Sequence, residues 1–375
     1  MKKVVIAIDS FKGCLPSVEA GKAAAEGIRS VYPECEVICL PIADGGEGML
    51  DVLIMATNGQ EVPISAHDPL MRWRNTYYGI SENGETAFIE MASISGLPLV
   101  PPERRNPMLT TTYGTGEIIR DALERGCRNF IIGIGGSATN DAGLGMLQAL
   151  GFRFSDKEGK EVGTGRGEVL IKVAHIDSTC VHPALNSCRF TVACDVQNPF
   201  YGPEGAAYVF APQKGANRKM VEALDAGLQN FAEVIRHTTG KDISHHPGAG
   251  AAGGMGGSLL AFLNAELKPG IQLMLEALDF SNKIKSADLI ITGEGKADRQ
   301  TLMGKVPSGI LAEARKQNIP VILLAGNIED SDELQQAGFG GVFSVNPPFI
   351  SLEEAMRPEV ARKNIQQTVE SICKK

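Results

Sequence analysis

Short apolar runs rich in β-branched residues recur along the chain, and each ends in a glycine-rich or acidic loop before a helical pattern begins. Six such runs are readable, at residues 3–8, 37–41, 129–134, 289–291, 321–324 and 341–345. This alternation is typical of a parallel α/β sheet. Because parallel strands of an open sheet deliver their carboxyl ends to one edge, the pattern predicts that the six following loops meet in a single crevice.

Two stretches, residues 65–112 and 151–287, differ from this pattern and carry hairpin signals such as the ENGE sequence at residues 82–85. They predict a second, mixed α+β domain that interrupts the first, with an active site in the cleft between the two. We also expect a last helix over residues 352–374. The expected fold is α/β, with a parallel flavodoxin- or Rossmann-like domain formed by residues 1–64, 113–150 and 288–375 and an inserted domain formed by residues 65–112 and 151–287.

Length and charge narrow the class of partner. A chain of 375 residues is long enough for two or three domains. Its net charge of −8 argues against nucleic acid or an anionic membrane surface as the main partner, since both require a basic face. The apolar run before Asp9 is too short for a signal-peptide core or a membrane span. These features predict a protein that acts on a small molecule, and they leave homodimer formation open.

The number and spacing of the cysteines indicate the redox state of the compartment in which the protein works. The chain has eight cysteines, without CxxC pairs and without a compact disulfide framework. This spacing predicts free thiols in a reducing environment. We therefore expect a cytoplasmic protein.

The DSFKG sequence at residues 9–13 places Asp9, Ser10 and Lys12 directly after the first predicted strand. An alanine-rich helix follows, with Ser17 as its expected N-cap. Because the free N–H groups of a helix N-terminus attract anions, this turn is a candidate anion site. The alternative is an ordinary strand-to-helix turn with a solvated lysine.

The ADGGEG sequence at residues 43–48 repeats this arrangement, with two acidic residues around two glycines. Acids beside a glycine turn suit a magnesium site or a base for a hydroxyl better than a bare phosphate loop. The alternative is an acidic turn in which Asp44 caps the next helix.

The loop at residues 133–145, GIGGSATNDAGLG, is the richest in candidate ligands. A buried strand runs into Gly135, Gly136 and Ser137 at an expected helix start, which favours binding of a phosphate or carboxylate by backbone N–H groups. The same residues imitate the dinucleotide fingerprint in the weak form G-x-G-x-x-A. A dinucleotide-dependent oxidoreductase is therefore kept as an alternative.

A second glycine-rich loop, GAGAAG at residues 248–253, has the full G-x-G-x-x-G spacing but follows two histidines and a proline instead of a strand. We expect this loop, with Gly253 and Gly254, to cover ATP phosphates before a helix that begins at about Gly257. The alternative is close helix packing without a ligand. A Walker A motif is absent, so a nucleotide must be held in another way.

Further acidic residues follow two other predicted strands. Asp195 comes after the apolar run 190–194 and is a candidate base. Asn198 follows three residues later, and Lys214 is a further polar side chain along the same segment. A satisfied turn aspartate is the alternative at Asp195. The GEGKADRQTLMGK sequence at 293–305 gathers Glu294, Asp298 and Lys305, either as a ligand site or as a solvated charge cluster.

In this order, DSFKG, ADGGEG, FIEMASISGL, GIGGSATND, ACDVQNP, QKGA, PGAGAAGGMGG and TGEG resemble the bacterial class I glycerate kinases over essentially the whole chain. The resemblance implies ATP-dependent phosphorylation of D-glycerate, commonly to 2-phosphoglycerate, on a flavodoxin-like domain with an inserted α/β domain. The chain departs from the family pattern at Met49 and at residues 70–74, LMRWR. These departures affect substrate fine-tuning and leave the expected phosphate loops intact.

A phosphotransferase needs phosphate donors, magnesium ligands, a group that orients the attacking hydroxyl and a cation for the substrate carboxylate. We expect ATP and Mg²⁺ as cofactors. We expect Asp195, Lys12 and Asp44 to be catalytic, and Asp9, Ser10, Lys12 and Asn198 to bind substrate. The expected nucleotide or phosphate ligands are Gly135, Gly136, Ser137, Gly253, Gly254, Glu294 and Lys305, and the expected metal ligands are Asp44 and Asp298. A non-catalytic sugar-acid-binding protein is the alternative from another class, and the sequence does not fix which hydroxyl of glycerate is phosphorylated.

Overall fold

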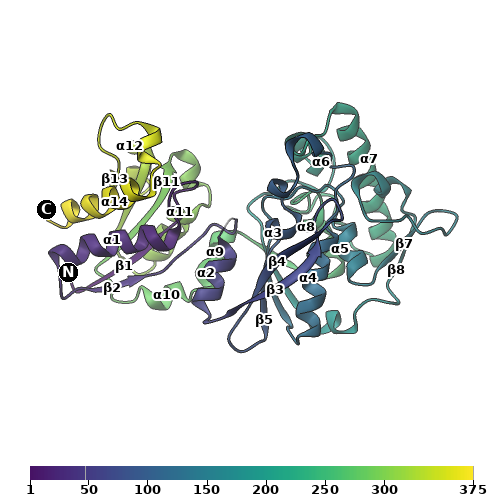
Figure 1. Ribbon diagram of the computed structural model, residues 1–375, viewed down its shortest axis with the longest axis horizontal. Helices are drawn as coiled ribbons and strands as arrows, with labels where there is room; N and C mark the ends of the chain where they lie inside the picture. The colour runs from purple at the N-terminus through teal and green to yellow at the C-terminus, as the bar shows by residue number, and fades with distance from the viewer. Residues whose placement is uncertain (47, 375) are drawn as a thin grey trace. The chain divides into compact units, whose positions relative to one another are not determined.

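A computed structural model describes residues 1–46 and 48–374, and the chain divides into two compact units. Unit 1 consists of residues 1–44 and 271–375, and unit 2 of residues 45–270. Both ends of the chain therefore belong to unit 1, as the purple and yellow ribbon in Figure 1 shows. Unit 2 is inserted between the two halves of unit 1.

Unit 1 is built on a five-stranded parallel sheet in the order β13-β12-β11-β1-β2. Numbered within the unit, this order is 2-1-3-4-5, the order of the flavodoxin-like folds. The predicted parallel, flavodoxin-like sheet is confirmed. The strands are β1 Lys3–Ile8, β2 Glu36–Cys39, β11 Leu289–Ala297, β12 Val321–Ile328 and β13 Gly341–Ser344.

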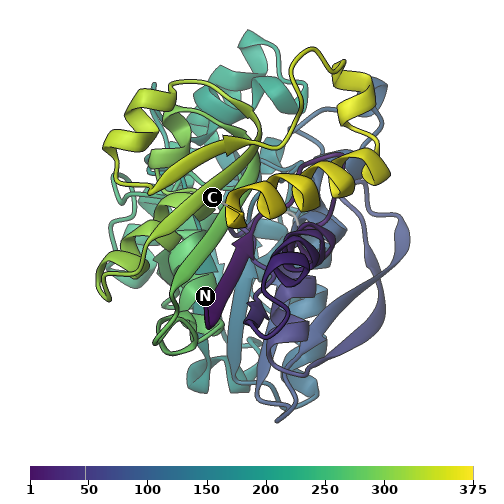
Figure 2. The ribbon, with the colours of Figure 1, turned by 90° about the vertical axis from the view of Figure 1, so that its left-hand side faces the viewer.

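Helices cover both faces of this sheet. Helices α1 and α14 lie side by side over the face to which Val4, Ile6 and Ile8 point, and Figure 2 shows them in front of the strands. Helix α11 packs against β11 and β12. The helices of the unit are α1 Ser17–Val31, α9 Gly270–Ala277, α10 Phe280–Lys283, α11 Val306–Arg315, α12 Ser331–Gln336, α13 Leu352–Ala355 and α14 Pro358–Cys373.

Two expectations for the helices of unit 1 were wrong in detail. Pro16, not Ser17, is the N-cap of α1; the Ser17 hydroxyl donates instead to the Ile8 carbonyl (2.6 Å) and accepts from the Ile42 N–H (3.0 Å). Ser17 thereby links Ile8, at the end of β1, to Ile42, which follows β2. The expected last helix is divided into α13 and α14 because Pro358, which lacks an N–H, starts a new helix at its first turn.

Unit 2 contains a six-stranded mixed sheet in the order β10-β9-β6-β5-β4-β3. In this sheet β5, β6, β9 and β10 pair in parallel, whereas β3, β4 and β5 pair antiparallel. Residues 82–85 form the predicted hairpin turn between β4 and β5. A separate two-stranded sheet pairs β7 with β8. The strands are β3 Gln60–His67, β4 Trp73–Ile80, β5 Thr86–Glu90, β6 Asn129–Gly133, β7 Arg153–Ser155, β8 His175–Asp177, β9 Arg189–Ala193 and β10 Glu266–Lys268.

The division into units differs from the expected domain boundaries. Residues 45–64 and 113–150, which we expected in the first domain, lie in unit 2, because β6 pairs with β5 and β9 instead of joining the sheet of unit 1. The Phe130 ring of β6 stacks on the Phe190 ring of β9 with centroids 4.6 Å apart, and both rings are buried. Five of the six predicted strands therefore share one sheet.

The helices of unit 2 enclose one large apolar core that also contains the inner face of the sheet. Of the described helices, none combines the length and the apolar character that crossing a bilayer requires. Helix α8 begins close to the expected position. The helices are α2 Met49–Ala56, α3 Ala92–Ser95, α4 Tyr113–Glu124, α5 Leu144–Ala149, α6 Ala206–Phe210, α7 Arg218–Thr239 and α8 Met255–Phe262.

Candidate active site

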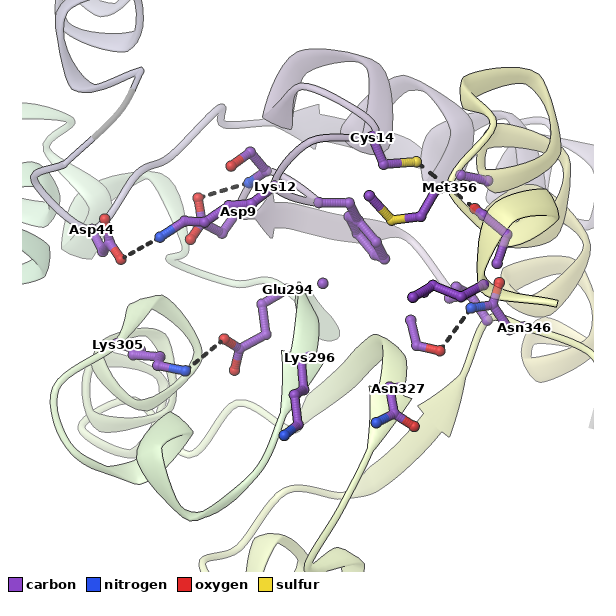
Figure 3. A pocket seen from close by; sticks show the side chains of 18 residues that line it. Asp9, Lys12, Cys14, Asp44, Glu294, Lys296, Lys305, Asn327, Asn346 and Met356 are labelled. Atoms are coloured by element: carbon purple, nitrogen blue, oxygen red, sulfur yellow. Dashed lines mark hydrogen bonds and ion pairs between the residues drawn. The ribbon is translucent and has the colours of Figure 1, made fainter. Parts of the chain in front are cut away.

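A cavity of about 300 Å³ lies at the sheet edge of unit 1. Strands β1 and β11 are neighbours in the sheet, and the chain leaves them in opposite directions along the strand order. Ligands of open α/β sheets bind at such a topological switch point, outside the carboxyl ends of the strands. The cavity brings together six of the predicted site residues, Asp9, Ser10, Lys12, Asp44, Glu294 and Lys305 (Figure 3).

Asp9 is the most strongly perturbed acid of this cavity. It directly follows β1, is 6% exposed and accepts a hydrogen bond from the Ser10 N–H (2.7 Å). Burial, reinforced by the nearby Asp44 carboxylate, raises the pKa of Asp9 from 3.8 to about 7. Asp9 is therefore an acid that exchanges its proton near neutral pH.

Lys12 and Asp44 form an ion pair at the mouth of the cavity. The Lys12 Nζ lies 3.4 Å from Asp44 Oδ2, and the lysine side chain is 62% exposed. Burial opposes the charge of the ammonium group, but Asp44 and Asp9 outweigh this effect and raise the pKa of Lys12. The ammonium group stays charged and accessible to an anionic ligand.

Glu294 is the third carboxylate of the cavity and is buried. Its oxygens accept a hydrogen bond from the Thr301 hydroxyl (2.6 Å) and lie 3.5 Å from Lys305 Nζ. Burial raises the pKa of Glu294, while Thr301 and Lys305 oppose this shift. Lys305 immediately precedes α11 as its N-cap residue.

The predicted magnesium ligands are placed differently from each other. Asp44 lines the cavity, whereas Asp298 lies outside it, caps the short 3₁₀ helix Arg299–Leu302 by accepting from Gln300 N–H (2.8 Å), and pairs with Lys296 (3.5 Å). Burial opposes ionisation of Asp298, but the Gln300 N–H and nearby lysines lower its pKa.

The donor set of the cavity fits a magnesium ion that is shared with a substrate. Within the described part of the chain, groups of three or more metal-binding side chains are absent. Magnesium, however, is commonly held by one or two carboxylates together with substrate phosphates and water. The carboxylate of Asp44, with Asp9 and Glu294 lining the same cavity, supplies such hard oxygen ligands.

The GGS loop, residues 135–137 after β6, is the second predicted site and lies on unit 2. Gly135 and Gly136 are exposed, and their N–H groups take part in no hydrogen bond between described residues. Gly136 has φ +71°, and only Ala92 Cβ lies within 4 Å of the place where its own Cβ would stand. The two N–H groups are available to an anion.

The expected helix start at this loop was wrong. Helix α5 begins only at Leu144, and the Asp141 carboxylate accepts N–H groups of Gly143 and Gly145, both at 3.2 Å. The dinucleotide interpretation therefore lacks its structural context, because that fingerprint requires a helix that opens at the glycines. An anion at this loop would contact glycine backbone and not a helix N-terminus.

A buried lysine supports the GGS loop from within. Lys214 is 2% exposed, and its ammonium group donates to the Ser137 hydroxyl (2.8 Å) and the Thr139 carbonyl (2.6 Å). Burial lowers the pKa of Lys214 to about 7, and Asp141 opposes this shift. The Asn140 amide and the Thr139 hydroxyl are also buried, and neither has a hydrogen-bond partner among the described residues. The loop thus holds more polar groups than its packing uses.

The glycines at 253–254 are buried, which differs from their expected role in covering phosphates. A Cβ on Gly253 would stand 2.2 Å from the Thr139 carbonyl oxygen, and the Gly253 carbonyl accepts from the Ala142 N–H (3.0 Å). Both glycines have positive φ. Their place in the structure fits the packing alternative, in which they hold the chain segment behind the GGS loop.

Asp195 and Asn198 follow β9 on unit 2. Asp195 is exposed and accepts from the Gly270 N–H (2.8 Å), and the Asn198 amide donates to the Glu204 carbonyl (2.8 Å). The sequence analysis missed Asn327, near the end of β12, and Asn346, two residues after β13, which both line the cavity of unit 1. Their position at strand ends was the signal that could have found them.

An α/β protein of two units emerges, with a charged cavity at the switch point of a flavodoxin-like sheet and an exposed glycine loop on a mixed sheet; both features suit the handling of phosphate groups. The model of the glycerate kinase family matches residues 4–375. Curated relatives include a glycerate kinase of Bacillus subtilis, 46% identical over 99% of this chain and 97% of its own length. A glycerate 2-kinase of Escherichia coli is 48% identical over 95% of this chain and 93% of its own length.

A solved structure agrees with these sequence relatives. The crystal structure of a protein described as glycerate kinase 2 of Salmonella typhimurium has a TM-score of 0.91 and 44% identity, covering 100% of this chain and 97% of the other. The chain belongs to the glycerate kinase family. The resemblance noted in the sequence is thereby confirmed.

Proposed function

We propose that this protein transfers the terminal phosphoryl group of ATP to a hydroxyl of D-glycerate, with 2-phosphoglycerate as the favoured product. The observation that carries the proposal is the cavity of unit 1, which collects six motif residues of the family resemblance at the switch point of the sheet. Membership of the glycerate kinase family supports the substrate and the reaction class. Phosphoryl transfer relies mainly on positioning and charge neutralisation, for which these residues are suited.

In the proposed reaction, a glycerate hydroxyl oxygen forms a bond to the γ-phosphorus of ATP while the bond from that phosphorus to the β–γ bridging oxygen breaks, and ADP leaves. The hydroxyl proton passes to a carboxylate, which we assign to Asp195. The Gly270 N–H holds one oxygen of Asp195, so the carboxylate is oriented before substrate arrives.

Mg²⁺, when bound, would neutralise phosphate charge during the transfer. Asp44 would hold it, with Asp9 and Glu294 as the other carboxylates of the cavity. Asp298 is less suited than we expected, because its carboxylate is engaged in a helix cap and an ion pair. Lys305 would contact a phosphate group from its position beside Glu294.

We assign capture of the glycerate carboxylate to the accessible ammonium group of Lys12, assisted by Ser10 and Asp9. Asn198 of unit 2 stays a proposed substrate-binding residue. We assign a phosphate contact to the N–H groups of Gly135 and Gly136 and the hydroxyl of Ser137. The buried Lys214 is a positioning residue for this loop. Gly253 and Gly254 act through packing.

We further propose that the protein works in the cytoplasm, which its eight free cysteines support. Phosphorus NMR of a reaction with ATP, Mg²⁺ and D-glycerate tests the function and its product together. The expected result is loss of the γ-phosphate signal of ATP and growth of the signal of 2-phosphoglycerate. A 3-phosphoglycerate signal would correct the regiochemistry, and binding of glycerate without any new signal would favour the sugar-acid-binding alternative.

A further inference from the structure

The cavity of unit 1 has two chemically different ends. One end carries the charged groups described above, around Asp44 and Glu294. Figure 3 shows these charged side chains on one side and Cys14 and Met356 on the other. The second end is largely apolar and is lined by Phe11, Cys14, Val345, Leu352, Ala355 and Met356.

The apolar end is formed by buried side chains with an exposed rim. Phe11, Val345 and Ala355 are 4–8% exposed, whereas Leu352 is 78% exposed and Met356 39%. An apolar surface of this kind gains free energy when a ligand removes it from water. Glycerate cannot use it, because each of its three carbons carries oxygen. A flat heteroaromatic ring can.

Asn346 places one polar group at this apolar end in a fixed orientation. Its amide nitrogen donates to the Gly326 carbonyl (2.8 Å), and its amide oxygen accepts from the amide of Asn364 (3.2 Å), which is buried. A carboxamide can donate twice and accept twice. Among the described residues, these bonds use one donor and one acceptor of Asn346, which leaves a donor and an acceptor side by side. That pair matches the donor and acceptor on the edge of an adenine ring.

We propose that the apolar end binds the purine base of ATP, with Asn346 reading the edge of the base and the triphosphate directed toward Asp44, Glu294 and Lys305. This inference rests on the proposed function. It adds a site for the nucleotide base to a chain that has no Walker A motif. The volume of about 300 Å³ is at the lower end of the range of small-molecule sites, roughly 300–1,000 Å³, and suits one base with part of its ribose.

The test fills the apolar end without touching the charged one. Ala355→Phe places a ring where the base would lie, and Ala312→Phe, on the exposed side of α11 outside the cavity, is the matched control. For Ala355→Phe we expect a rise of about tenfold or more in the KM for ATP and an equal weakening of ADP binding by calorimetry. The KM for D-glycerate should change less than twofold. Inhibition by inorganic tripolyphosphate, which has no base, should be unchanged.

Unchanged ATP and ADP affinities in a folded Ala355→Phe variant would overturn the base site, as would an equal loss of tripolyphosphate inhibition. If thermal melting shows that this variant is unfolded, Leu352→Asp decides, because Leu352 is exposed at the rim and its replacement leaves the core intact. A several-fold rise in the KM for ATP is expected there, and no rise would overturn the proposal. Wild-type protein that binds ADP but shows no glycerate-dependent turnover would contradict the proposed function and leave the base site standing.

Discussion

The cavity of unit 1 and the GGS loop of unit 2 offer different chemical groups to an anionic ligand. The cavity presents ionisable side chains, three carboxylates and accessible lysines, that lie at the ends of parallel strands. The loop presents exposed glycine backbone, with the amine of Lys214 buried behind it. Side chains can hold a metal and exchange protons, whereas glycine N–H groups approach an anion closely and carry no net charge.

Burial shifts the pKa values of an acid in the cavity and of a lysine behind the loop in opposite directions. It raises the pKa of Asp9 in the cavity to about 7 and lowers the pKa of Lys214 behind the loop to about 7. In each case the low-dielectric surroundings favour the neutral form. Under the proposed function, unit 1 would supply the carboxylates that hold a metal and the accessible lysines, and unit 2 the base Asp195 and a preformed, nearly neutral glycine loop.

The largest expected effect comes from removing the charge of Asp44. Asp44→Asn should lower kcat by on the order of 10³-fold and weaken the dependence of the rate on Mg²⁺, because the proposed metal ligand is lost. The measurement is initial rate against Mg²⁺ concentration. Asp298→Asn is the matched comparison and should raise the Mg²⁺ requirement less than tenfold. Equal effects of the two variants would place Asp298 on the metal as well.

The next effect tests the backbone device of unit 2. Gly136→Val, at φ +71°, should lower kcat/KM by on the order of 10²-fold, because a branched side chain strains the loop and shields its N–H groups. Gly84→Val is the matched control, since Gly84 has φ +75° and open space around it in the β4–β5 turn. Valine at either position strains the backbone to a similar extent, because the two φ angles are nearly equal.

Thermal melting with ATP distinguishes the roles of these two glycines. ATP should raise the Tm of wild type and of Gly84→Val, and should raise the Tm of a folded Gly136→Val much less. A Gly136→Val protein that melts early yet keeps the full ATP-induced rise would show that the glycine serves folding alone.

Asp9 and Lys214 predict opposite pH dependences of stability. Between about pH 4 and 7 folded Asp9 keeps a proton that the unfolded chain has released, so its contribution to stability falls as pH rises through this window. Between about pH 7 and 10.5 the unfolded chain keeps a proton that folded Lys214 lacks, so stability rises with pH there. Each contribution is on the order of 4 kcal/mol, because each pKa differs by about three between the folded and the unfolded chain.

Urea unfolding across these windows measures the two contributions. Asp9→Asn should remove the acid-side slope and leave the alkaline one, and Lys214→Met should do the reverse. A Lys214→Met variant that retains the alkaline slope would show that the slope arises from other groups and not from Lys214.

The smallest expected effect concerns substrate capture by Lys12. Lys12→Ala should raise the KM for D-glycerate by about tenfold and the KM for ATP less than twofold, because its proposed partner is the glycerate carboxylate. Lys22→Ala is the control, since Lys22 is an exposed lysine paired with Glu19 on α1. A rise confined to the KM for ATP would move Lys12 to the nucleotide phosphates.

The sequence predicts strands better than it predicts their partners. All six apolar runs become strands, but an apolar run does not specify the sheet it joins. Strand β6 pairs with β5 and β9, and its Phe130 packs against Phe190, which is far away in the chain. Strands β11 and β12 also run past their apolar parts, and polar residues such as Lys296 and Asn327 pair there. Glycines in these extensions look like loops in the sequence.

In the candidate site too, local features could be predicted from the sequence and long-range contacts could not. The charged residues of the cavity could be predicted, because residues at the ends of parallel strands converge wherever the strands share a sheet. The buried state of Lys214 could not, since it results from contacts with Ser137 and Thr139, more than seventy positions away. Gly253 and Gly254 match a phosphate-loop spacing, and the spacing alone does not reveal that both glycines are buried.

Glycerate-dependent formation of ADP is the most direct test of the account. The purified full chain, with ATP and Mg²⁺, should release ADP at a rate that rises and saturates with D-glycerate, and one ADP should appear for each phosphoglycerate. In the absence of glycerate the rate should be near zero. ADP release that is indifferent to D-glycerate, or no release with ligand bound, would contradict the proposal that this protein is a glycerate kinase in activity.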